Sequence, residues 1–390
     1  MYKCASFFAG VGGIDLGFEL TGKFKTIYAN EFDTSPAKTF ALNFPSVNLE
    51  VKDIKDVNSN DIENIDVIMG GFPCQAFSVA GNRQGFDDEK GRGTLFFEML
   101  RIIKDKKPRI VFCENVKNLV GHDNGNTFKV IRESLENEGY KLKYKVLNSM
   151  DYGNVPQNRE RIYIVGFRNE SDYHNFEFPD PIELTKTIKD VADFNNKVDE
   201  RFYYTQGKYA NNLYEKLIDA MDDDNTTYQW RRKYVRKNQS NVIPTLTANM
   251  GEGGHNVPLI KTKTGIRKLT PKECFNAQGY PESFALPKEI VDSKLYKQAG
   301  NSVSVTVIER IADNIAKACE QTDSKGIKCI SCSQVVPSNL GYKYCPFCGA
   351  VLKYTHHRAV VWKLLLFLFS TKFCEKRFWR SFNFQPYFAE

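Results

Sequence analysis

The first candidate for chemistry is a cysteine in a glycine-rich turn. The apolar run at residues 67–69 is typical of a buried strand, and Gly70, Gly71 and Pro73 force a tight turn directly before Cys74. A free cysteine is most often a small hydrophobic residue of the core. A thiol held by a stiff turn at the end of a strand can instead serve as a nucleophile, because the accessible thiolate is the reactive form.

A carboxyl group and two arginines are the natural partners of such a nucleophile. Glu114 follows the apolar run at residues 110–113, so its carboxyl is expected at the same edge of the sheet as Cys74. A thiolate beside a carboxyl that can bond a ring nitrogen suggests addition to an electron-poor heterocycle. Taken alone, Glu114 would be equally typical of the negative charge at a helix N-terminus. Arg159 and Arg161 alternate before another strand and therefore point to one face, where they could bind a phosphate or a ring carbonyl, or brace the loop.

The N-terminal segment points to a cofactor. A glycine-rich turn follows the first apolar run, and Gly10 and Gly12 let a ligand approach the backbone closely. Glu31 lies 21 residues after Gly10, at the end of the second expected strand, where a carboxylate can accept both hydroxyls of a ribose. Asp53 falls where the third strand should end and could meet an adenine amino group. A glycine loop followed by two acids describes an adenosine-type cofactor, and the incomplete dinucleotide fingerprint disfavours NAD.

Alternating apolar runs and helical patterns in the first half of the chain predict an α/β domain that has a parallel sheet with helices on both faces. From about residue 169 to 265 the chain is polar, aromatic and irregular, which indicates a smaller inserted or appended domain. Two helical patterns then return, and the last is expected to pack back on the first domain. The expected strands are residues 4–9, 26–29, 66–69, 110–113 and 162–167, and the expected helices are residues 14–20, 94–105, 127–138, 267–278 and 296–320.

A basic and aromatic stretch suits a polyanionic partner. Residues 226–268 hold nine Lys or Arg against one acidic residue, Glu252, and Tyr228, Trp230 and Tyr234 lie among them. The interleaved aromatic rings favour nucleic acid over a solvated charged face. The chain opens on a strand pattern rather than a secretory signal and has no apolar run long enough to span a bilayer, so a reducing cytoplasm is the expected setting.

Four cysteines near the C-terminus have the spacing of a zinc site. Cys329 and Cys332 form one Cys-x-x-Cys knuckle, and Cys345 and Cys348 form a second after twelve intervening residues. Four thiolates with this spacing can close tetrahedrally around Zn²⁺, so the expected role is structural, with a redox role as the alternative. Three roles stay open for the apolar tail at 355–390: a docking segment, a membrane-surface anchor or a poorly ordered end.

From about Lys3 to Lys317 the chain resembles the DNA (cytosine-5)-methyltransferases of bacterial restriction–modification systems. Most of the family's motifs are present in the family's order, which makes the resemblance very specific. One departure is Phe32, where many members have tryptophan, although an aromatic ring is kept. The matching motifs are Phe7 to Gly12, Asn30-Glu31, Asp53-Ile54, Pro73-Cys74-Gln75, Gly93 to Phe96, Glu114-Asn115-Val116, Gln157 to Arg161, Arg267 to Pro271 and Gly300 to Val303.

The resemblance implies a mechanism that uses S-adenosyl-L-methionine. Cys74 would attack C6 of a cytosine flipped out of duplex DNA, Glu114 would hold or protonate N3, and C5 would then take the methyl group. Arg161 would contact the cytosine carbonyl and Arg159 would support the loop, while residues 77–93 would form a mobile lid. The residues implied to surround the cofactor are Phe7, Gly10, Gly12, Glu31, Phe32, Asp53, Ile54, Pro73, Leu95 and Asn301.

The resemblance also implies how the chain is organised. Residues 1–168, completed by 290–320, would form the Rossmann-like catalytic and cofactor domain, and residues 169–289 would form the smaller, irregular target-recognition domain and return segment. Outside the family's common core, the cysteine spacing predicts a zinc-ribbon-like unit at residues 326–354 before the tail, and these segments leave open an extra binding or regulatory function. The expected partner is double-stranded DNA, together with a cognate restriction endonuclease that shares the target site without direct contact. The chain is expected to be a monomer in the bacterial cytoplasm, associated with the nucleoid through DNA.

Two other functions are alternatives. A tRNA cytosine-5 methyltransferase would share the catalytic domain, but the motif around Cys74 and the long recognition region resemble the DNA-modifying type. A zinc-ribbon DNA-binding protein with an inactive or regulatory methyltransferase domain would have no need to keep Cys74, Glu114 and Arg161 intact. Methyl transfer to duplex DNA separates all three functions.

Overall fold

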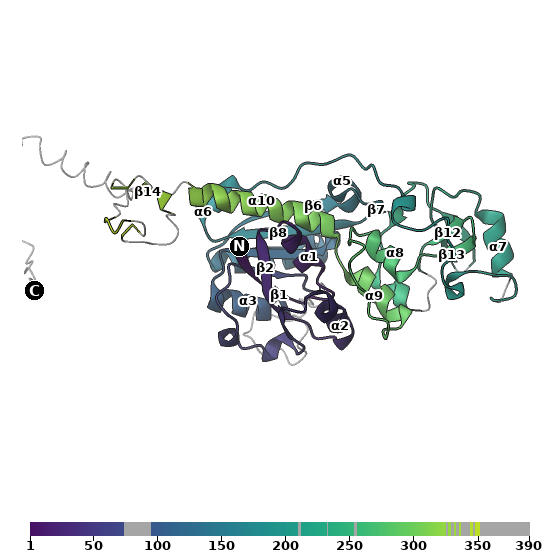
Figure 1. Ribbon diagram of the computed structural model, residues 1–390, viewed down its shortest axis with the longest axis horizontal. Coiled ribbons are helices and arrows are strands. Elements are labelled where there is room, and N and C mark those ends of the chain that lie inside the picture. Colours follow the sequence, from purple (N-terminus) through teal and green to yellow (C-terminus); the bar gives the residue numbers. More distant parts are fainter. Residues whose placement is uncertain are drawn as a thin grey trace, which may run out of the picture. The chain divides into compact units, whose positions relative to one another are not determined.

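The computed structural model shows two compact units, Met1–Thr322 and Asp323–Glu390 (Figure 1). The residues that the structure describes are 1–73, 95–209, 212–231, 233–252, 256–324, 327–328, 331–332, 335–336, 344–345 and 348–351. Cys74, the expected lid at 77–93, Cys329 and the tail at 355–390 lie outside these residues. Among the described helices, none is long and apolar enough to cross a membrane.

A seven-stranded sheet forms the centre of the first unit, in the order β3-β2-β1-β4-β5-β8-β6 (Figure 1). Its first five strands are parallel, as predicted, but β8 runs antiparallel to both β5 and β6. The prediction of an entirely parallel sheet was therefore wrong. The reason lies in the connection, because the residues between β6 and β8 are too few for a crossover helix. The strands are β1 (Tyr2–Phe7), β2 (Phe24–Asn30), β3 (Asn48–Glu50), β4 (Val67–Gly70), β5 (Ile110–Val116), β6 (Lys141–Asn148) and β8 (Glu160–Phe167).

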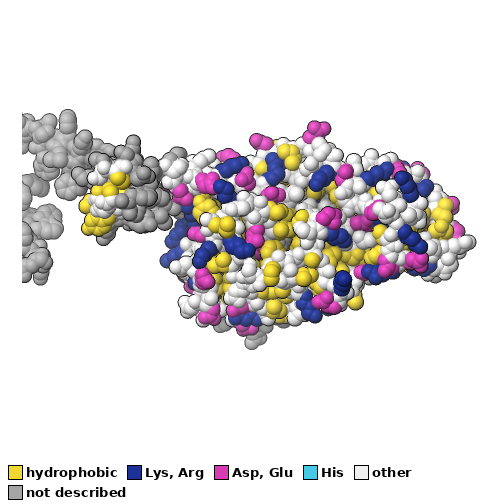
Figure 2. All heavy atoms as spheres, viewed as in Figure 1, with side chains coloured by type: hydrophobic (Ala, Val, Ile, Leu, Met, Phe, Trp, Pro, Cys, Tyr) yellow, Lys and Arg dark blue, Asp and Glu magenta, His cyan; other side chains and the backbone are white. Residues whose placement is uncertain are grey.

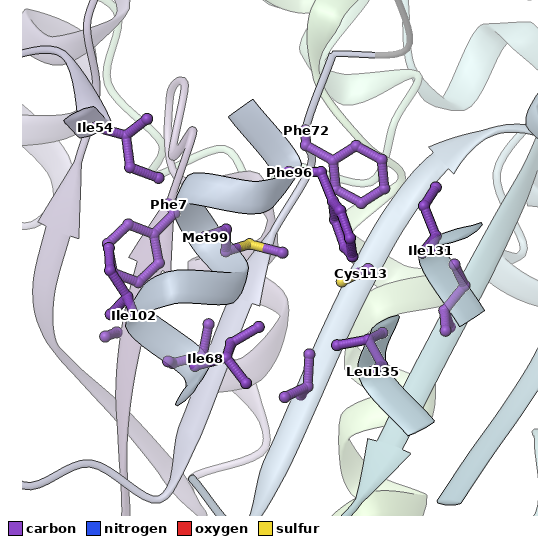
Figure 3. Close-up of a cluster of buried hydrophobic side chains, with 14 of the residues drawn as sticks. Phe7, Ile54, Ile68, Phe72, Phe96, Met99, Ile102, Cys113, Ile131 and Leu135 are labelled. Carbon is purple, nitrogen blue, oxygen red and sulfur yellow. The ribbon is translucent and has the colours of Figure 1, made fainter. Parts of the chain in front are cut away.

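Helices cover both faces of this sheet, as the sequence predicts. On one face, Phe96, Met99 and Ile102 of α3 pack against Ile68 of β4 and Cys113 of β5 (Figure 3). Because neighbouring residues of a strand point to opposite faces, Val67, Met69, Ile110 and Phe112 pack instead on α1 and α10. The covering helices are α1 (Gly13–Leu20), α3 (Leu95–Lys106), α4 (Asn126–Asn137) and α10 (Val305–Ser324).

Two predicted helices have different boundaries in the structure. The pattern at 296–320 is two helices, α9 (Asp292–Asn301) and α10, because Ser302 leaves the helical conformation after α9. The pattern at 267–278 begins as a strand, β13 (Gly265–Lys268), and only then becomes α8 (Pro271–Asn276). A capping box between Thr270 and Glu273, with proline at the first helical turn, fixes where α8 begins.

A second, four-stranded antiparallel sheet lies within the region that the sequence marks as irregular. Its strands have three or four residues each, which is too short for a strand period to show. Its core includes Leu217, Tyr228, Leu259 and Ile266. α2 (Thr34–Asn43) connects β2 to β3 of the central sheet. The elements of the irregular region and its flanking connections are α5 (Ser149–Gly153), β7 (Gln157–Asn158), α6 (Glu170–Asn175), α7 (Leu213–Ala220), β9 (Tyr228–Trp230), β10 (Val235–Lys237), β11 (Ile243–Pro244) and β12 (Leu259–Thr262).

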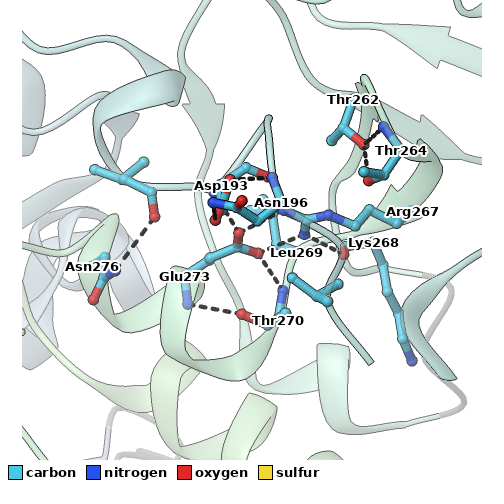
Figure 4. Close-up of polar contacts among 12 residues, drawn as sticks. Asp193, Asn196, Thr262, Thr264, Arg267, Lys268, Leu269, Thr270, Glu273 and Asn276 are labelled. Carbon is cyan, nitrogen blue, oxygen red and sulfur yellow. Dashed lines mark hydrogen bonds and ion pairs between the residues drawn. The ribbon is translucent and has the colours of Figure 1, made fainter. Parts of the chain in front are cut away.

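A buried ion pair joins β13 to α8. Arg267 is fully buried and donates two hydrogen bonds of 2.7 Å to the carboxylate of Glu273 (Figure 4). The same guanidinium also donates to the backbone carbonyl of Asp193. Glu273 accepts a further bond from the Thr270 amide at 2.7 Å. The pair therefore fixes the start of α8 against the second sheet and the 193 loop.

The Glu273→Ala substitution should lower the free energy of unfolding by about 3–5 kcal/mol, because it leaves the Arg267 guanidinium buried and unpaired. Urea unfolding followed by circular dichroism measures the change. Glu200→Ala is the matched control, since Glu200 pairs with Lys197 in an exposed position, and its effect should be much smaller. Equal effects from the two variants would contradict the role assigned to the buried pair.

Candidate functional site

The carboxyl ends of four parallel strands meet at one edge of the central sheet. Phe7 of β1 pairs with Asn30 of β2 and with Gly70 of β4, and Gly70 pairs with Cys113 of β5. The segments that follow these strands are therefore neighbours, at the edge where ligands bind in open α/β sheets. These segments carry Gly10, Glu31 and Pro73, and Glu114 lies near the carboxyl end of β5 itself.

The turn that leads to Cys74 is held close to Glu114. Cys74 itself lies outside the described residues, but Phe72 is anchored, because its carbonyl accepts a 2.7 Å hydrogen bond from the Asn115 side chain. A Cβ atom added at Gly71 would lie 3.4 Å from Oε2 of Glu114. The backbone entering the predicted nucleophile therefore runs beside the predicted acid.

Glu114 and Arg161 form an ion pair across neighbouring strands. The Nε atom of Arg161 lies 3.1 Å from Oε1 of Glu114, and both side chains are largely buried. Burial raises the pKa of Glu114, and the charges of Arg161 and Arg159 oppose that rise without cancelling it. The carboxyl can therefore hold a proton at a higher pH than an exposed glutamate can.

Arg159 lies in a different environment from Arg161. It is 1% exposed, and its guanidinium donates to the carbonyls of Leu246 at 2.7 Å, Gly300 at 3.2 Å and Ser302. Burial, aided by the charge of Arg161, lowers its pKa to about 9. Its described hydrogen bonds go to backbone carbonyls of the protein, which favours loop bracing among the roles that the sequence left open for this arginine.

The glycine loop after β1 is organised by Glu31. Oε2 of Glu31 accepts the amide of Gly10 at 2.7 Å, and Oε1 accepts the amide of Asp33 at 2.7 Å. Burial raises the pKa of Glu31. Gly10 and Gly12 both have positive φ, and a Cβ atom at Gly12 would lie only 2.3 Å from the Phe44 ring. The loop therefore requires glycine, and it places the Glu31 carboxylate at its rim.

Of the remaining residues predicted to surround the cofactor, some lie in the core or in segments next to it, and the others are exposed. Phe7 and Ile54 belong to the core under the site, Leu95 begins α3 and is half-buried, and Asp53 accepts the Lys55 amide at 3.0 Å. β3 ends at Glu50, so Asp53 follows the strand by three residues instead of ending it. The exposed groups are Phe32, which is 72% exposed, Pro73 and Asn301.

Two asparagines at this edge were missed by the sequence reasoning. The Asn30 side chain donates to the carbonyls of Glu50 at 3.1 Å and Lys52 at 2.9 Å, which holds β2 against the segment that carries Asp53. Asn115 holds the turn before Cys74 through Phe72. Each asparagine lies next to a predicted site residue, Glu31 or Glu114, so its position in the sequence could have drawn attention to it. Its role could not be predicted, because hydrogen bonds from side chains to the backbone leave no pattern in a sequence.

The model of the family described as C-5 cytosine-specific DNA methylase matches residues 2–317. The chain belongs to this family. It is a type II DNA (cytosine-5)-methyltransferase of the restriction–modification class, and the cofactor of such an enzyme is S-adenosyl-L-methionine.

Relatives and solved structures agree with the family. Type II methyltransferase M.Bsp6I of Bacillus sp. strain RFL6 is 63% identical over 318 residues, which are 82% of this chain and 99% of the relative. Type II methyltransferase M.HhaI of Haemophilus parahaemolyticus is 38% identical over 80% of this chain and 93% of its own. The crystal structure of a Spodoptera frugiperda DNMT2 mutant has the same fold, with a TM-score of 0.62 and 20% identity over 81% of this chain and 99% of that one.

The second unit brings three of the four predicted zinc ligands together. The Sγ atoms of Cys332, Cys345 and Cys348 all lie within 4.8 Å of one another, and those of Cys332 and Cys345 are 3.6 Å apart. Gly349, with φ of 73°, turns the second knuckle so that its amide donates to the Cys345 carbonyl at 2.8 Å. The fourth predicted ligand, Cys329, lies outside the described residues.

The Glu114→Gln substitution should lower the rate of methyl transfer by about 10²–10⁴-fold, the usual contribution of a general acid. Because the pKa of Glu114 is raised, a step that needs its protonated form is fast below that pKa and slows as the pH rises through it. The alkaline decline should therefore disappear in the variant. Single-turnover rates across about pH 5–9 measure both effects.

Glu160→Gln is the control for this experiment, because Glu160 lies beside Arg161 in the chain but forms an exposed ion pair with Lys117. Its rate and pH profile should match the wild type. An unchanged alkaline decline in Glu114→Gln would show that another group titrates.

Proposed function

We propose that the chain methylates C5 of a cytosine flipped out of duplex DNA, with Cys74 as the nucleophile and Glu114 as the acid at N3. The observation that carries this proposal is the buried pair of Glu114 and Arg161 beside the turn that leads to Cys74. A carboxyl with a raised pKa suits donation to a ring nitrogen, and a guanidinium beside it suits the ring carbonyl.

The chain's own residues would act in two half-reactions. The Cys74 thiolate adds to C6 while the Glu114 carboxyl protonates N3, so C5 becomes nucleophilic. S-adenosyl-L-methionine supplies an electrophilic methyl group on its sulfonium. After transfer to C5, a base removes the C5 proton, the C6–S bond breaks to return its electron pair to Cys74, and N3 gives its proton back to the Glu114 carboxylate. Arg161 neutralises charge that develops on the ring carbonyl.

The residues at the sheet edge fit the cofactor. Each carboxylate oxygen of Glu31 accepts one backbone amide and keeps capacity for a ribose hydroxyl. Phe32 presents an exposed ring that suits an adenine face. The missing side chain at Gly10 leaves open space beside the loop, because among the described residues a Cβ atom there would meet only the Phe8 carbonyl, at 4.0 Å. We assign the ribose to Glu31, the adenine to Phe32 and Asp53, and the methionine end to the glycine loop and Asn301.

We assign target recognition to residues 169–289, within the domain boundaries that the sequence predicts. Arg231, Lys233 and Arg236 are exposed around the hairpin of β9 and β10. The basic surface is smaller than the composition predicts, because Arg267 is buried with Glu273 and Lys237 pairs with Asp222 at 2.8 Å. On the face seen in Figure 2, Lys and Arg side chains are interspersed with Asp and Glu. The exposed cations around the β9–β10 hairpin therefore support contacts with individual phosphates and bases, and not binding by one continuous basic surface.

The Cys74→Ser substitution should abolish both methyl transfer and covalent trapping. With duplex DNA that contains 5-fluorocytosine, the wild type should form a stable adduct, because the fluorine at C5 blocks elimination. The variant should form no adduct, and its turnover should fall by at least about 10³-fold. Denaturing gels and tritium transfer from labelled cofactor measure the two effects.

Cys113→Ala is the matched control, because Cys113 is fully buried in the core and burial raises the pKa of its thiol to about 12. The Cys113→Ala variant should still form the covalent adduct with DNA that contains 5-fluorocytosine. An active Cys74→Ser enzyme would overturn the assignment of the nucleophile. A wild type that labels no duplex would overturn the function, and labelling of tRNA alone would favour the first alternative. Bisulfite sequencing of DNA from cells that express the chain identifies the target site, which a cognate endonuclease would share.

We also propose that the second unit binds one structural Zn²⁺ through Cys329, Cys332, Cys345 and Cys348. Tetrahedral coordination by thiolates places neighbouring sulfurs about 3.8 Å apart, close to the 3.6 Å between Cys332 and Cys345. That separation is far longer than the roughly 2 Å of a disulfide bond. The arrangement therefore favours a metal over the redox role. This module lies beyond the 2–317 segment that the family model matches.

Purified full-length protein should contain about one zinc per chain, as four-thiolate structural sites do. The double variant Cys345→Ser and Cys348→Ser should lose the metal, since it removes one whole knuckle. Cys274→Ser should keep it, because Cys274 is buried in the first unit. Elemental analysis measures the content, and zinc well below one per chain in the wild type would refute the site.

A further inference from the structure

A buried carboxyl group lies between α1 and the central sheet, and the proposed chemistry does not use it. Asp15 of α1 is 0% exposed. Its Oδ2 atom accepts a hydrogen bond from the Ser6 hydroxyl of β1 at 3.0 Å, and its Oδ1 atom accepts one from the Thr26 hydroxyl of β2 at 3.2 Å. Within the described ranges this carboxyl forms no ion pair, so a negative charge on it is stabilised by two hydroxyls and its own backbone amide.

The carboxyl group lies at an irregularity in the pairing of β1 with β2. Cys4 pairs with Thr26, but the next residue, Ala5, pairs with Tyr28, so Ile27 is an extra residue on β2. Such β-bulges are rare between parallel strands, and the extra residue disrupts the ladder locally. The bulge therefore needs support from outside the sheet.

α1 supplies this support with two acidic side chains. Asp15 accepts from the Thr26 hydroxyl, and Glu19, one turn further along α1, accepts from the Thr26 amide at 2.9 Å. Thr26 thus directs both of its polar donors at α1. Because α1 follows Gly12 of the glycine loop and β2 ends at Asn30, the contact joins two elements that lead to the same edge of the sheet.

The groups around Asp15 compensate its charge poorly. Burial raises its pKa to about 7, and the hydrogen bonds from Ser6 and Thr26 oppose that rise without cancelling it. Lys25 of β2 is a charged neighbour, but it pairs with Glu19 at 3.2 Å. On the other side of α1, α10 contributes apolar side chains. The titratable groups that interact electrostatically with Asp15 are Glu19 on α1, Cys4 on β1 and Tyr280 after α8.

We propose that Asp15 is a proton-operated latch, which holds α1 on the bulge of β2 most firmly when its carboxyl is neutral. A neutral carboxyl can stay buried with few partners, whereas an ionised one is strongly disfavoured away from water. A rise in pH therefore favours conformations in which α1 lifts and the carboxylate is hydrated. The catalytic unit thus has a conformational response to pH that arises outside the proposed catalytic and cofactor groups.

The Asp15→Asn substitution keeps the shape of the side chain and removes its charge, since an amide can accept from one hydroxyl and donate to the other. The pKa of Asp15 in the folded chain, about 7, lies above the ordinary value of 3.8. The stability that its proton supplies is therefore complete below about pH 4 and is lost as the pH rises to about 7. Between about pH 5 and 7, the unfolding constant of the wild type should rise about tenfold per pH unit relative to that of the variant.

Urea unfolding of the full-length protein at a series of pH values measures both constants. Glu63→Gln is the control, because Glu63 forms an exposed ion pair with Lys3 beside β1, and such pairs contribute little to stability. Its pH dependence should follow that of the wild type. Parallel curves for the wild type and Asp15→Asn would overturn the proposal.

Thr26→Val tests the latch from the sheet side and remains informative if Asp15→Asn does not fold. It removes a hydroxyl that stabilises the ionised carboxylate, so it should raise the unfolding constant about fivefold more at about pH 8 than at about pH 5. Thr226→Val removes a similarly buried hydroxyl whose acceptor is the Asn238 carbonyl, which does not titrate. Its effect should be the same at both pH values, and an equally constant effect in Thr26→Val would contradict the latch.

The latch can be separated from the proposed chemistry. The alkaline decline in the rate of methyl transfer that we assign to Glu114 should persist in Asp15→Asn, measured at a temperature at which both proteins stay folded. Disappearance of that decline would show that Asp15 titrates in the reaction itself, and it would overturn the role as a latch. Failure of the wild type to methylate DNA would refute the proposed function and leave the unfolding experiment unaffected.

Discussion

The buried guanidinium of Arg159 holds together three segments that are distant in the sequence. Removing such a group from water costs several kcal/mol unless its donors are satisfied, and here the carbonyls of Leu246, Gly300 and Ser302 accept from it. Arg161 lies two residues further along and faces Glu114. The position of the Glu114–Arg161 pair, to which we assign the chemistry, therefore depends on contacts made by the fully buried Arg159.

The same junction links recognition to the cofactor edge. A Cβ atom at Gly300 would lie 2.1 Å from the Thr247 carbonyl carbon, so α9 and the segment after β11 are in direct backbone contact. β11 in turn pairs with β7, directly before Arg159. The segment at 243–248 is therefore in contact with both Arg159 and the end of α9. The proposed target-recognition region and the proposed catalytic edge are thus joined by direct backbone contacts.

Much of the catalytic unit could be predicted from the sequence, because strands buried on both faces are continuous apolar runs and the glycine loop has a strong local signature. The antiparallel direction of β8 could not be predicted, since it depends on the length of the connection from β6 and not on a pattern of apolar residues. Arg267 was assigned to a helix although Thr270, Pro271 and Glu273 form a capping-box pattern that already places the helix start after Arg267. The burial of Arg267 against Glu273 could not be predicted, because no sequence pattern pairs these two side chains. The buried role of Arg159 was equally hidden, because its acceptors are main-chain atoms, which every residue has.

Environment, more than residue type, separates the reactive groups of this chain from the inert ones. Cys113 and Glu114 are adjacent on β5, and strand alternation turns them to opposite sides. The Cys113 thiol faces hydrocarbon, and burial raises its pKa to about 12, so it stays protonated and unreactive. Glu114 is almost as deeply buried, yet two guanidinium groups limit the rise of its pKa. Of these two adjacent groups on β5, the carboxyl is therefore the one that suits the proton transfer proposed for this site.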